Sequence, residues 1–157
     1  MYESIKGILT DKTPHKAVIE MDGLGYRLSI PLSTYTRLPD LGKQLQLFLS
    51  QVIREDSNTL YAFLLKEERD LFETLITLSG IGPKSALSII GHLDISAFQR
   101  AIASADVRLL SKIPGIGKKT SEKLVIEMRD KFKAGKGKIA AFTHVDGLFG
   151  DAINALL

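Results

Sequence analysis

The amino-acid sequence predicts an α+β protein in which a small β-barrel precedes an all-helical domain. Three observations support this prediction. Short runs with strand character fill residues 1–63, several of them alternating apolar and polar residues. From Lys66 onward the apolar residues follow helical spacing, and one glycine-rich stretch of this second part occurs twice. We therefore expect two domains, 1–63 and 64–133.

The barrel domain is built from five short strands, one of them preceded by a short helix. The strands are expected at residues 5–9, 17–21, 26–30, 45–53 and 60–63. Asp22 and Gly23 form a turn signal between two of them, and we expect Gly7 to break the first. Ser33 to Leu38 has the composition of a short helix. Five strands in about 63 residues suit a small closed barrel, for which the OB-fold is the commonest design and an SH3-like barrel is the main rival.

The second part is predicted to be entirely helical, with glycine at most junctions. The expected helices cover residues 66–78, 83–91, 96–102, 107–112 and 118–133. Ser96 stands at the spacing of a capping box and is expected to cap the third of them. Residues 134–150 have the composition of a glycine-rich linker, and 151–157 resemble the first turns of an amphipathic helix.

An internal repeat relates residues 75–90 to residues 110–125. A shift of 35 residues places matching apolar, glycine and lysine positions on one another. The matched pairs are Leu75 and Leu110, Gly80 and Gly115, Ile81 and Ile116, Gly82 and Gly117, and Lys84 and Lys119. Each copy therefore predicts two helices joined by a tight Gly-Ile-Gly turn.

The chemistry of this unit favours phosphate binding. Glycine leaves the backbone unshielded, and the N–H groups that open the second helix form an anion site. Lys84, Lys118 and Lys119 add cations at the positive end of the helix dipole, an arrangement that is unfavourable by itself. A bound phosphate would neutralise both the lysines and the helix end. A single copy is more simply explained as a glycine turn in a helical bundle with lysines for solubility. Two matching copies favour phosphate binding.

Two better-known phosphate motifs do not fit the repeat. A P-loop requires glycine at position 112, which is Lys112, and a preceding strand. A dinucleotide fingerprint requires a third glycine, where the two copies have Ser85 and Thr120. Binding of ATP is therefore not expected.

The positive charge of the chain is concentrated in the helical part. The net charge of the whole chain is +3, whereas residues 1–63 carry 7 cations and 7 anions. The chain has no cysteine, which excludes a disulfide framework and any cysteine-based zinc site or nucleophile. No apolar run approaches the roughly 20 residues of a membrane span, and the N-terminus lacks the layout of a signal peptide. We therefore expect a cytoplasmic protein.

The two glycine-rich units resemble tandem helix-hairpin-helix motifs, which bind the DNA backbone without reading its sequence. Combined with the barrel, with Val52-Ile53-Arg54-Glu55-Asp56 and with Leu60-Tyr61-Ala62-Phe63, they resemble the RuvA family of Holliday-junction-binding subunits. The resemblance covers residues 1 to about 133. It departs at Ala62, where glycine is usual, and at the third domain, of which only the start matches 151–157.

The resemblance implies structure-specific binding of four-way junction DNA by a homotetramer, or by two tetramers face to face. It also implies two protein partners, the RuvB ATPase, which would bind the third domain, and the RuvC resolvase. Glu55 and Asp56 match an acidic pin at the centre of the junction. The residues expected to contact the DNA backbone are Arg54, Gly80, Ile81, Gly82, Lys84, Gly115, Ile116, Gly117, Lys118, Lys119, Thr120 and Lys123.

Several interpretations of single residues remain open from the sequence. Arg54 is equally suited to contacting phosphate and to pairing with Glu55, and Lys123 follows Lys119 by one helical turn. Glu55 and Asp56 also suggest a metal site, but neighbouring hairpin residues usually point to opposite sides and no further acidic partner is evident. We therefore expect no metal, no cofactor and no catalytic residue. The alternative functions are a helix-hairpin-helix nuclease or glycosylase and an architectural protein that binds duplex DNA.

Overall fold

A computed structural model of the chain describes residues 1–134, which fall into two compact units. The first unit is Met1–Arg69 and the second begins at Asp70. The expected linker at 135–150 and the expected helix start at 151–157 lie outside the described residues. Within the described part, no helix has the length and apolar character needed to span a membrane.

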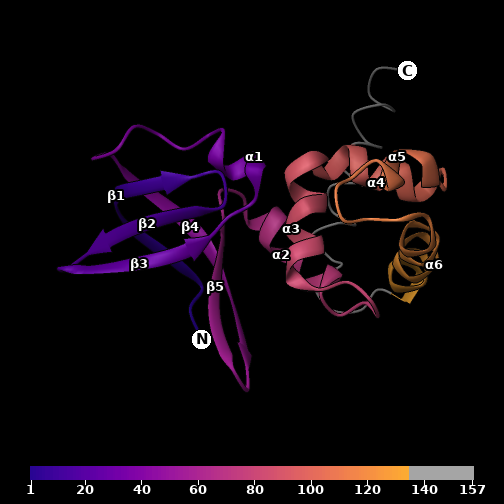
Figure 1. Cartoon of the computed structure of the whole chain (residues 1–157), viewed down its shortest axis with the longest axis horizontal. Helices are drawn as coiled ribbons and strands as arrows, with labels where there is room; N and C mark the ends of the chain where they lie inside the picture. Colours follow the sequence, from indigo (N-terminus) through magenta and orange to yellow (C-terminus); the bar gives the residue numbers. More distant parts are fainter. Residues whose placement is uncertain (135–157) are drawn as a thin grey trace. The chain divides into compact units, whose positions relative to one another are not determined.

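The first unit is a closed five-stranded barrel (Figure 1). Its strands are β1 (Ser4–Thr13), β2 (Lys16–Met21), β3 (Leu24–Ser29), β4 (Gln44–Arg54) and β5 (Ser57–Phe63). They follow the order β1-β2-β3-β5-β4, and all neighbours are antiparallel except β3 and β5. This closed order confirms the OB-type barrel. The short helix α1 (Leu32–Tyr35) lies between β3 and β4 and ends earlier than the expected Leu38.

The barrel core consists of the inward-facing residues of alternating positions. Side chains with no exposed surface include Leu9, Ala17, Ile19, Leu28, Leu47, Ala62 and Phe63. Many of their solvent-facing neighbours on the strands are polar or charged, as in Lys6, Glu20 and Gln46, although Ile8 beside Leu9 is exposed. Burial of one large aliphatic or aromatic side chain contributes about 1.5–3 kcal/mol, so this alternation specifies which face of each strand points inward.

Gly7 does not break the first strand, contrary to expectation. β1 runs through Gly7, which pairs with Leu45 of β4. A Cβ atom at this position would stand 2.5 Å from the Glu20 carbonyl oxygen and 2.8 Å from the Ile19 Cγ2 atom. Glycine is therefore needed because β2 passes too close for any side chain, and the strand remains continuous.

The first unit extends beyond the expected boundary at residue 63 and includes the start of α2 (Lys66–Leu75). The reason is the nearly buried guanidinium of Arg69. Its Nη1 and Nη2 atoms each donate to one carboxylate oxygen of Glu3, both at 3.1 Å, and Nη1 also donates to the Leu49 carbonyl oxygen at 3.3 Å. This bidentate arginine–carboxylate interaction holds the start of α2 against the barrel.

The second unit is helical and contains α3 (Pro83–His92), α4 (Ile95–Ala103), α5 (Val107–Ser111) and α6 (Lys118–Ala134) after the end of α2. Its buried side chains include Leu75, Ile89, Phe98, Leu110, Leu124 and Met128. The expected cap at Ser96 is wrong, because Asp94 caps α4 by accepting a hydrogen bond from the Ala97 N–H at 2.7 Å. Asp106 caps α5 in the same way through the Leu109 N–H.

Candidate nucleic-acid interface

The two copies of the sequence repeat adopt the same backbone conformation. The first glycine of each turn has a positive φ, +82° at Gly80 and +84° at Gly115. Within each copy the residue after that glycine donates to a carbonyl oxygen in the turn that follows the preceding helix, α2 in the first copy and α5 in the second. These bonds join the Ile81 N–H to the Leu78 carbonyl at 3.2 Å and the Ile116 N–H to the Ile113 carbonyl at 3.0 Å. The repeat in sequence is thus a repeat in structure.

The isoleucine between the two glycines turns inward in both hairpins. Ile81 is 5% exposed and Ile116 is 3% exposed. The other repeat positions also match in burial, since Leu75 and Leu110, Leu78 and Ile113, Ala86 and Ser121, and Ile89 and Leu124 are all buried. Each turn is therefore anchored from below by an apolar plug, and its polar backbone faces outward.

The helix that follows each turn begins with free backbone donors. The second glycine accepts the first helical bond in both cases, from Ala86 to Gly82 at 3.0 Å and from Ser121 to Gly117 at 2.9 Å. The N–H groups before that bond have no intrahelical acceptor, and no side chain caps α3. A Cβ atom at Gly82 or Gly117 would meet nothing within 4 Å, so the space above each turn is open. An anion can approach both helix starts directly.

Exposed lysines surround these helix starts. Lys84 lies in the first turn of α3, and Lys118 and Lys119 open α6. All three side chains are exposed, whereas Thr120 is half-buried. Pro83 occupies the first helical position, as expected, where its missing N–H costs nothing. The arrangement gives each hairpin a backbone anion cradle with mobile positive charge beside it.

Lys123 has a partner within the protein. Its ammonium group donates a 2.8 Å hydrogen bond to the hydroxyl of Ser79, immediately before the first glycine of the other hairpin. The sequence placed Lys123 beside Lys119 in one groove, but it gave no sign that Ser79 would lie within reach. Ser79 and Ser88, which also joins the two hairpins, are the residues that the sequence interpretation missed. The signal that identifies Ser88 is the repeat itself, because the 35-residue shift places it on Lys123.

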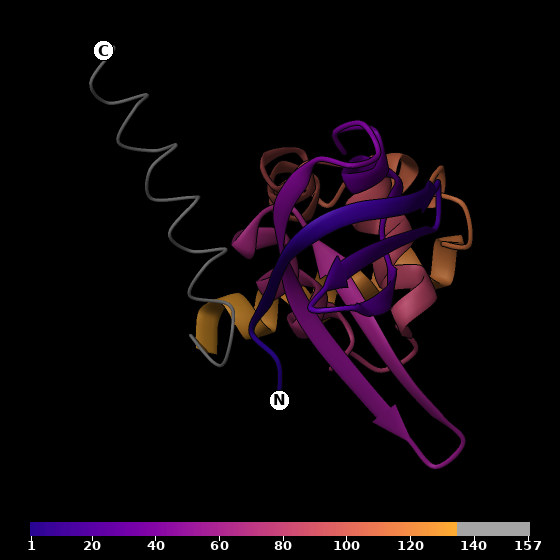
Figure 2. The same cartoon turned by 90° about the vertical axis from the view of Figure 1, so that its left-hand side faces the viewer.

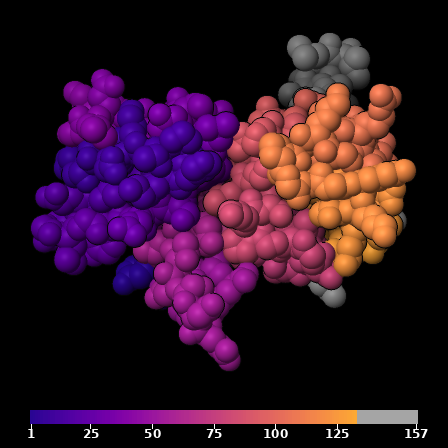
Figure 3. Space-filling view, viewed as in Figure 1, coloured from indigo at the N-terminus to yellow at the C-terminus, as the bar shows by residue number. Residues whose placement is uncertain are grey.

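The β4–β5 hairpin carries the two expected acidic residues at its tip. Its ladder runs from Phe48 opposite Phe63 to Arg54 opposite Ser57, which leaves Glu55 and Asp56 as a two-residue turn. Both acidic side chains are exposed. The hairpin extends well beyond the other strands of the barrel (Figure 2) and ends in a narrow projection (Figure 3). The tip of the hairpin therefore presents two negative charges on a narrow projection.

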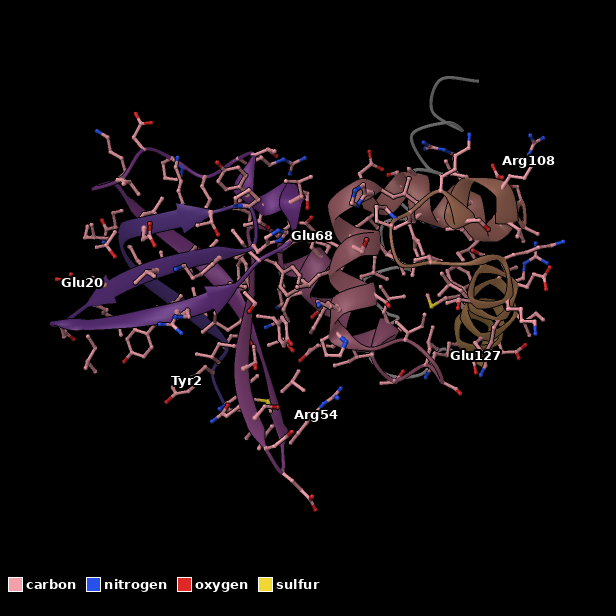
Figure 4. All side chains as sticks on the ribbon, viewed as in Figure 1. Tyr2, Glu20, Arg54, Glu68, Arg108 and Glu127 are labelled. Carbon is pink, nitrogen blue, oxygen red and sulfur yellow. The ribbon has the colours of Figure 1, made fainter. Side chains whose placement is uncertain are left out.

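Arg54 stands beside this tip without pairing to Glu55. Within the part of the chain that the structure describes, ion pairs join Lys16 to Asp11 and Arg69 to Glu3, and none joins Arg54 to Glu55. The Arg54 side chain is exposed and extends sideways from the hairpin (Figure 4). In residues 1–134, no group of three His, Asp or Glu side chains is placed to hold a metal ion. Of the two interpretations of Arg54, the geometry favours a cation that is available to phosphate over a partner of Glu55.

An OB-type barrel followed by two helix-hairpin-helix units defines a class of DNA-binding proteins that grip the phosphate backbone. Residues 1–62 match the family described as RuvA N terminal domain, and residues 72–130 match the SAM-like helix-hairpin-helix tandem. The chain is 43% identical to the Holliday junction branch migration complex subunit RuvA of Protochlamydia amoebophila, over 96% of this chain and 75% of that protein. It is 42% identical to the protein of the same name from Pseudomonas fluorescens strain SBW25, over 85% of this chain and 66% of that protein. The chain belongs to the RuvA family.

Proposed function

We propose that this protein binds four-way DNA junctions by their backbone, as a homotetramer, and serves as the non-catalytic DNA-binding subunit of a branch migration complex. The duplication of the hairpin with matching backbone and burial carries this proposal. Membership in the RuvA family supports it, because the names of the relatives describe subunits of such a complex at Holliday junctions. We propose that the protein acts in the cytoplasm, where bacterial chromosomal DNA is accessible.

The hairpins supply the grip on the duplex arms. The turns Gly80 to Gly82 and Gly115 to Gly117, together with the helix starts that follow them, present backbone N–H groups other than those of Ile81 and Ile116 to phosphate oxygens. Lys84, Lys118 and Lys119 neutralise the phosphate charge. Thr120 adds a hydroxyl at the start of α6, and Arg54 contributes a cation near the junction centre. None of these groups reads a base edge, so binding is independent of sequence.

The acidic hairpin supplies discrimination between DNA structures. Glu55 and Asp56 repel phosphates wherever the backbone is continuous along the duplex. An open four-way junction has a central gap between its strands, and only there does the projecting pair avoid a phosphate. In a fourfold assembly, four such hairpins converge on one centre, so the preference for junction over duplex DNA increases with each hairpin.

The motor and nuclease steps belong to partner proteins. We propose that the RuvB ATPase drives the DNA and that the RuvC resolvase cuts it, because the described residues of this chain offer backbone binding and no catalytic group. The segment that we assign to RuvB contact begins at residue 151 and lies outside the described residues.

A competition gel shift tests the proposed function. Labelled four-way junction is bound by the protein and challenged with unlabelled junction or with linear duplex of the same length. We expect junction to compete far better than duplex, and the logarithm of affinity to fall steeply with the logarithm of salt concentration.

Lysine variants connect this measurement to the hairpins. Lys118→Ala and Lys119→Ala should each reduce the salt slope by about one unit. Lys43→Ala provides the control, since Lys43 is an exposed lysine of the barrel outside the hairpins. Equal competition by duplex and junction would instead favour an architectural duplex binder, and cleavage of the junction with magnesium present would favour a nuclease.

A further inference from the structure

The two hairpins are joined by a reciprocal pair of hydrogen bonds. Ser88 on α3 donates from its hydroxyl to the Pro114 carbonyl oxygen at 2.7 Å. Lys123 on α6 donates from its ammonium to the Ser79 hydroxyl at 2.8 Å. Both bonds lie within the second unit and connect residues far apart in sequence.

These two bonds are related by the internal repeat. The 35-residue shift that aligns the hairpins places Ser88 on Lys123 and Ser79 on Pro114. Each bond therefore runs from one position of the second helix of a hairpin to the residue just before the first glycine of the other hairpin. The donor side chains differ in chemistry, yet the connection is the same in both directions.

The location of the acceptors matters for function. Ser79 precedes Gly80 and Pro114 precedes Gly115, and these glycines begin the two turns that present the anion cradles. A helix of one hairpin thus holds the turn of the other at its base. A shift of one turn breaks the bond at that turn, and separation of the two hairpins breaks both bonds.

We propose that Ser88 and Lys123 are positioning residues that set the spacing of the two phosphate-binding turns, and that Lys123 acts through Ser79 instead of contacting phosphate. The proposal rests on the function proposed above. Phosphates along duplex DNA have regular spacing, so two cradles at a matching distance bind together far more tightly than two cradles that move independently. Holding the turns in place before binding lowers the ordering cost that binding must meet.

The test compares variants that separate charge from positioning. Ser79→Ala removes the acceptor of Lys123 without changing any charge, and Lys123→Met removes the donor together with a cation. We expect each to weaken binding to duplex arms by about threefold to tenfold, the range of one net hydrogen bond, with an unchanged salt slope. The double variant should bind no worse than either single variant, because both changes break the same bond.

Two further variants complete the comparison. Ser88→Ala should weaken binding to a similar extent through the other bond, again with an unchanged salt slope. Lys119→Ala is the contrast, because a lysine that contacts phosphate lowers the slope by about one unit when it is removed. Lys123→Arg retains a charged donor of similar length and should restore most of the affinity lost in Lys123→Met.

The opposite pattern would overturn the proposal. If Lys123→Met lowers the salt slope by about one unit while Ser79→Ala binds like the wild type, Lys123 is a phosphate contact. Thermal unfolding of each variant checks the fold, and Ser79→Ala decides the matter alone if Lys123→Met unfolds, since Ser79 is exposed. Equal binding of junction and duplex would overturn only the proposed preference for junctions. The role of the Ser88–Pro114 and Lys123–Ser79 bonds is tested separately, by the affinity for duplex arms.

Discussion

The four glycines of the hairpin turns serve two different purposes. Gly80 and Gly115 have φ values near +83°, a region in which a residue with a Cβ atom is strained. Gly82 and Gly117 do not need glycine for their conformation, and a Cβ atom there would point into open space. The first pair therefore shapes the turn, whereas the second pair keeps the approach to the helix start clear.

Alanine substitution separates these two purposes. We expect Gly80→Ala and Gly115→Ala each to lower the free energy of unfolding by about 1–2 kcal/mol, measured by urea denaturation. Gly82→Ala and Gly117→Ala should leave the stability within about 0.5 kcal/mol of the wild type and still weaken DNA binding, because the added methyl group stands where a phosphate must approach. Normal DNA binding by both members of the second pair would contradict the assignment of the turns as phosphate cradles.

Glu68 introduces a pH dependence into the first unit. Burial raises the pKa of its carboxyl above the ordinary value of 4.5, although the Arg37 guanidinium and a hydrogen bond from Ser33 act in the opposite direction. The folded protein therefore holds this proton at a higher pH than the unfolded chain does. The stabilisation from Glu68 is complete below about pH 4.5 and is lost as the pH rises through the raised folded-state pKa.

The variant Glu68→Gln isolates this contribution. We expect the free energy of unfolding of the wild type, measured relative to that of Glu68→Gln, to fall as the pH rises from about 4 to 7. Denaturant titrations of both proteins across this range measure the difference, in which the effects of all other carboxyl groups cancel. A difference that rises with pH would show that the pKa of Glu68 is lowered on folding.

At the scale of elements, the barrel depends on the close approach of β1 and β2. Gly7 is the point of contact, with 2.5 Å between a Cβ atom built there and the Glu20 carbonyl oxygen. Backbone cannot yield as a flexible side chain does. Gly7→Ala should therefore lower the free energy of unfolding by about 1–3 kcal/mol, measured by urea denaturation. Gly25→Ala is the matched control on β3, where the nearest atom is the Val18 Cγ1 at 3.4 Å and ordinary contact suffices.

The β4–β5 hairpin shows how an element can be shaped for a ligand. Its base carries core residues such as Leu49 and Ala62, and its outer end carries exposed Ile53, Arg54, Glu55 and Asp56. Burial decreases toward the tip of the same pair of strands, where ladder hydrogen bonds and a 3.0 Å side-chain bond from Gln51 to Asn58 hold the two strands together. Such a hairpin projects charge away from the barrel and keeps a defined register.

At the scale of the whole molecule, the acidic tip is expected to govern the choice of DNA structure. The double variant Glu55→Gln/Asp56→Asn removes two negative charges and retains similar shapes. We expect it to bind junction DNA at least as tightly as the wild type, while its preference for junction over duplex falls by roughly fivefold or more, the equivalent of about 1 kcal/mol. Competition gel shifts measure this ratio.

A control for charge accompanies this prediction. Glu20→Gln removes an exposed carboxylate of β2, away from the hairpin tip. It should change both affinities slightly and leave their ratio intact. An unchanged ratio in the double variant would show that Glu55 and Asp56 do not act as a pin.

The class of fold, the existence of nearly every element and the internal repeat can be read from the amino-acid sequence alone. These features depend on local information, namely the alternation of burial in strands, the helical period and the conformational freedom of glycine in the turns at Gly80 and Gly115. Cap positions such as Asp94 were harder to predict, because several polar residues near a helix start compete for one role.

Contacts between residues that are distant in the chain could be identified only from the folded structure. It showed that Gly7 is needed because β2 passes close to it, that Arg69 is held by Glu3 across 66 positions, and that Lys123 reaches Ser79 across 44 positions. No local period carries such information, because these contacts depend on how completed elements pack against one another. The spacing of the two phosphate cradles is therefore a property of the packed helices, although each cradle alone can be recognised in the sequence.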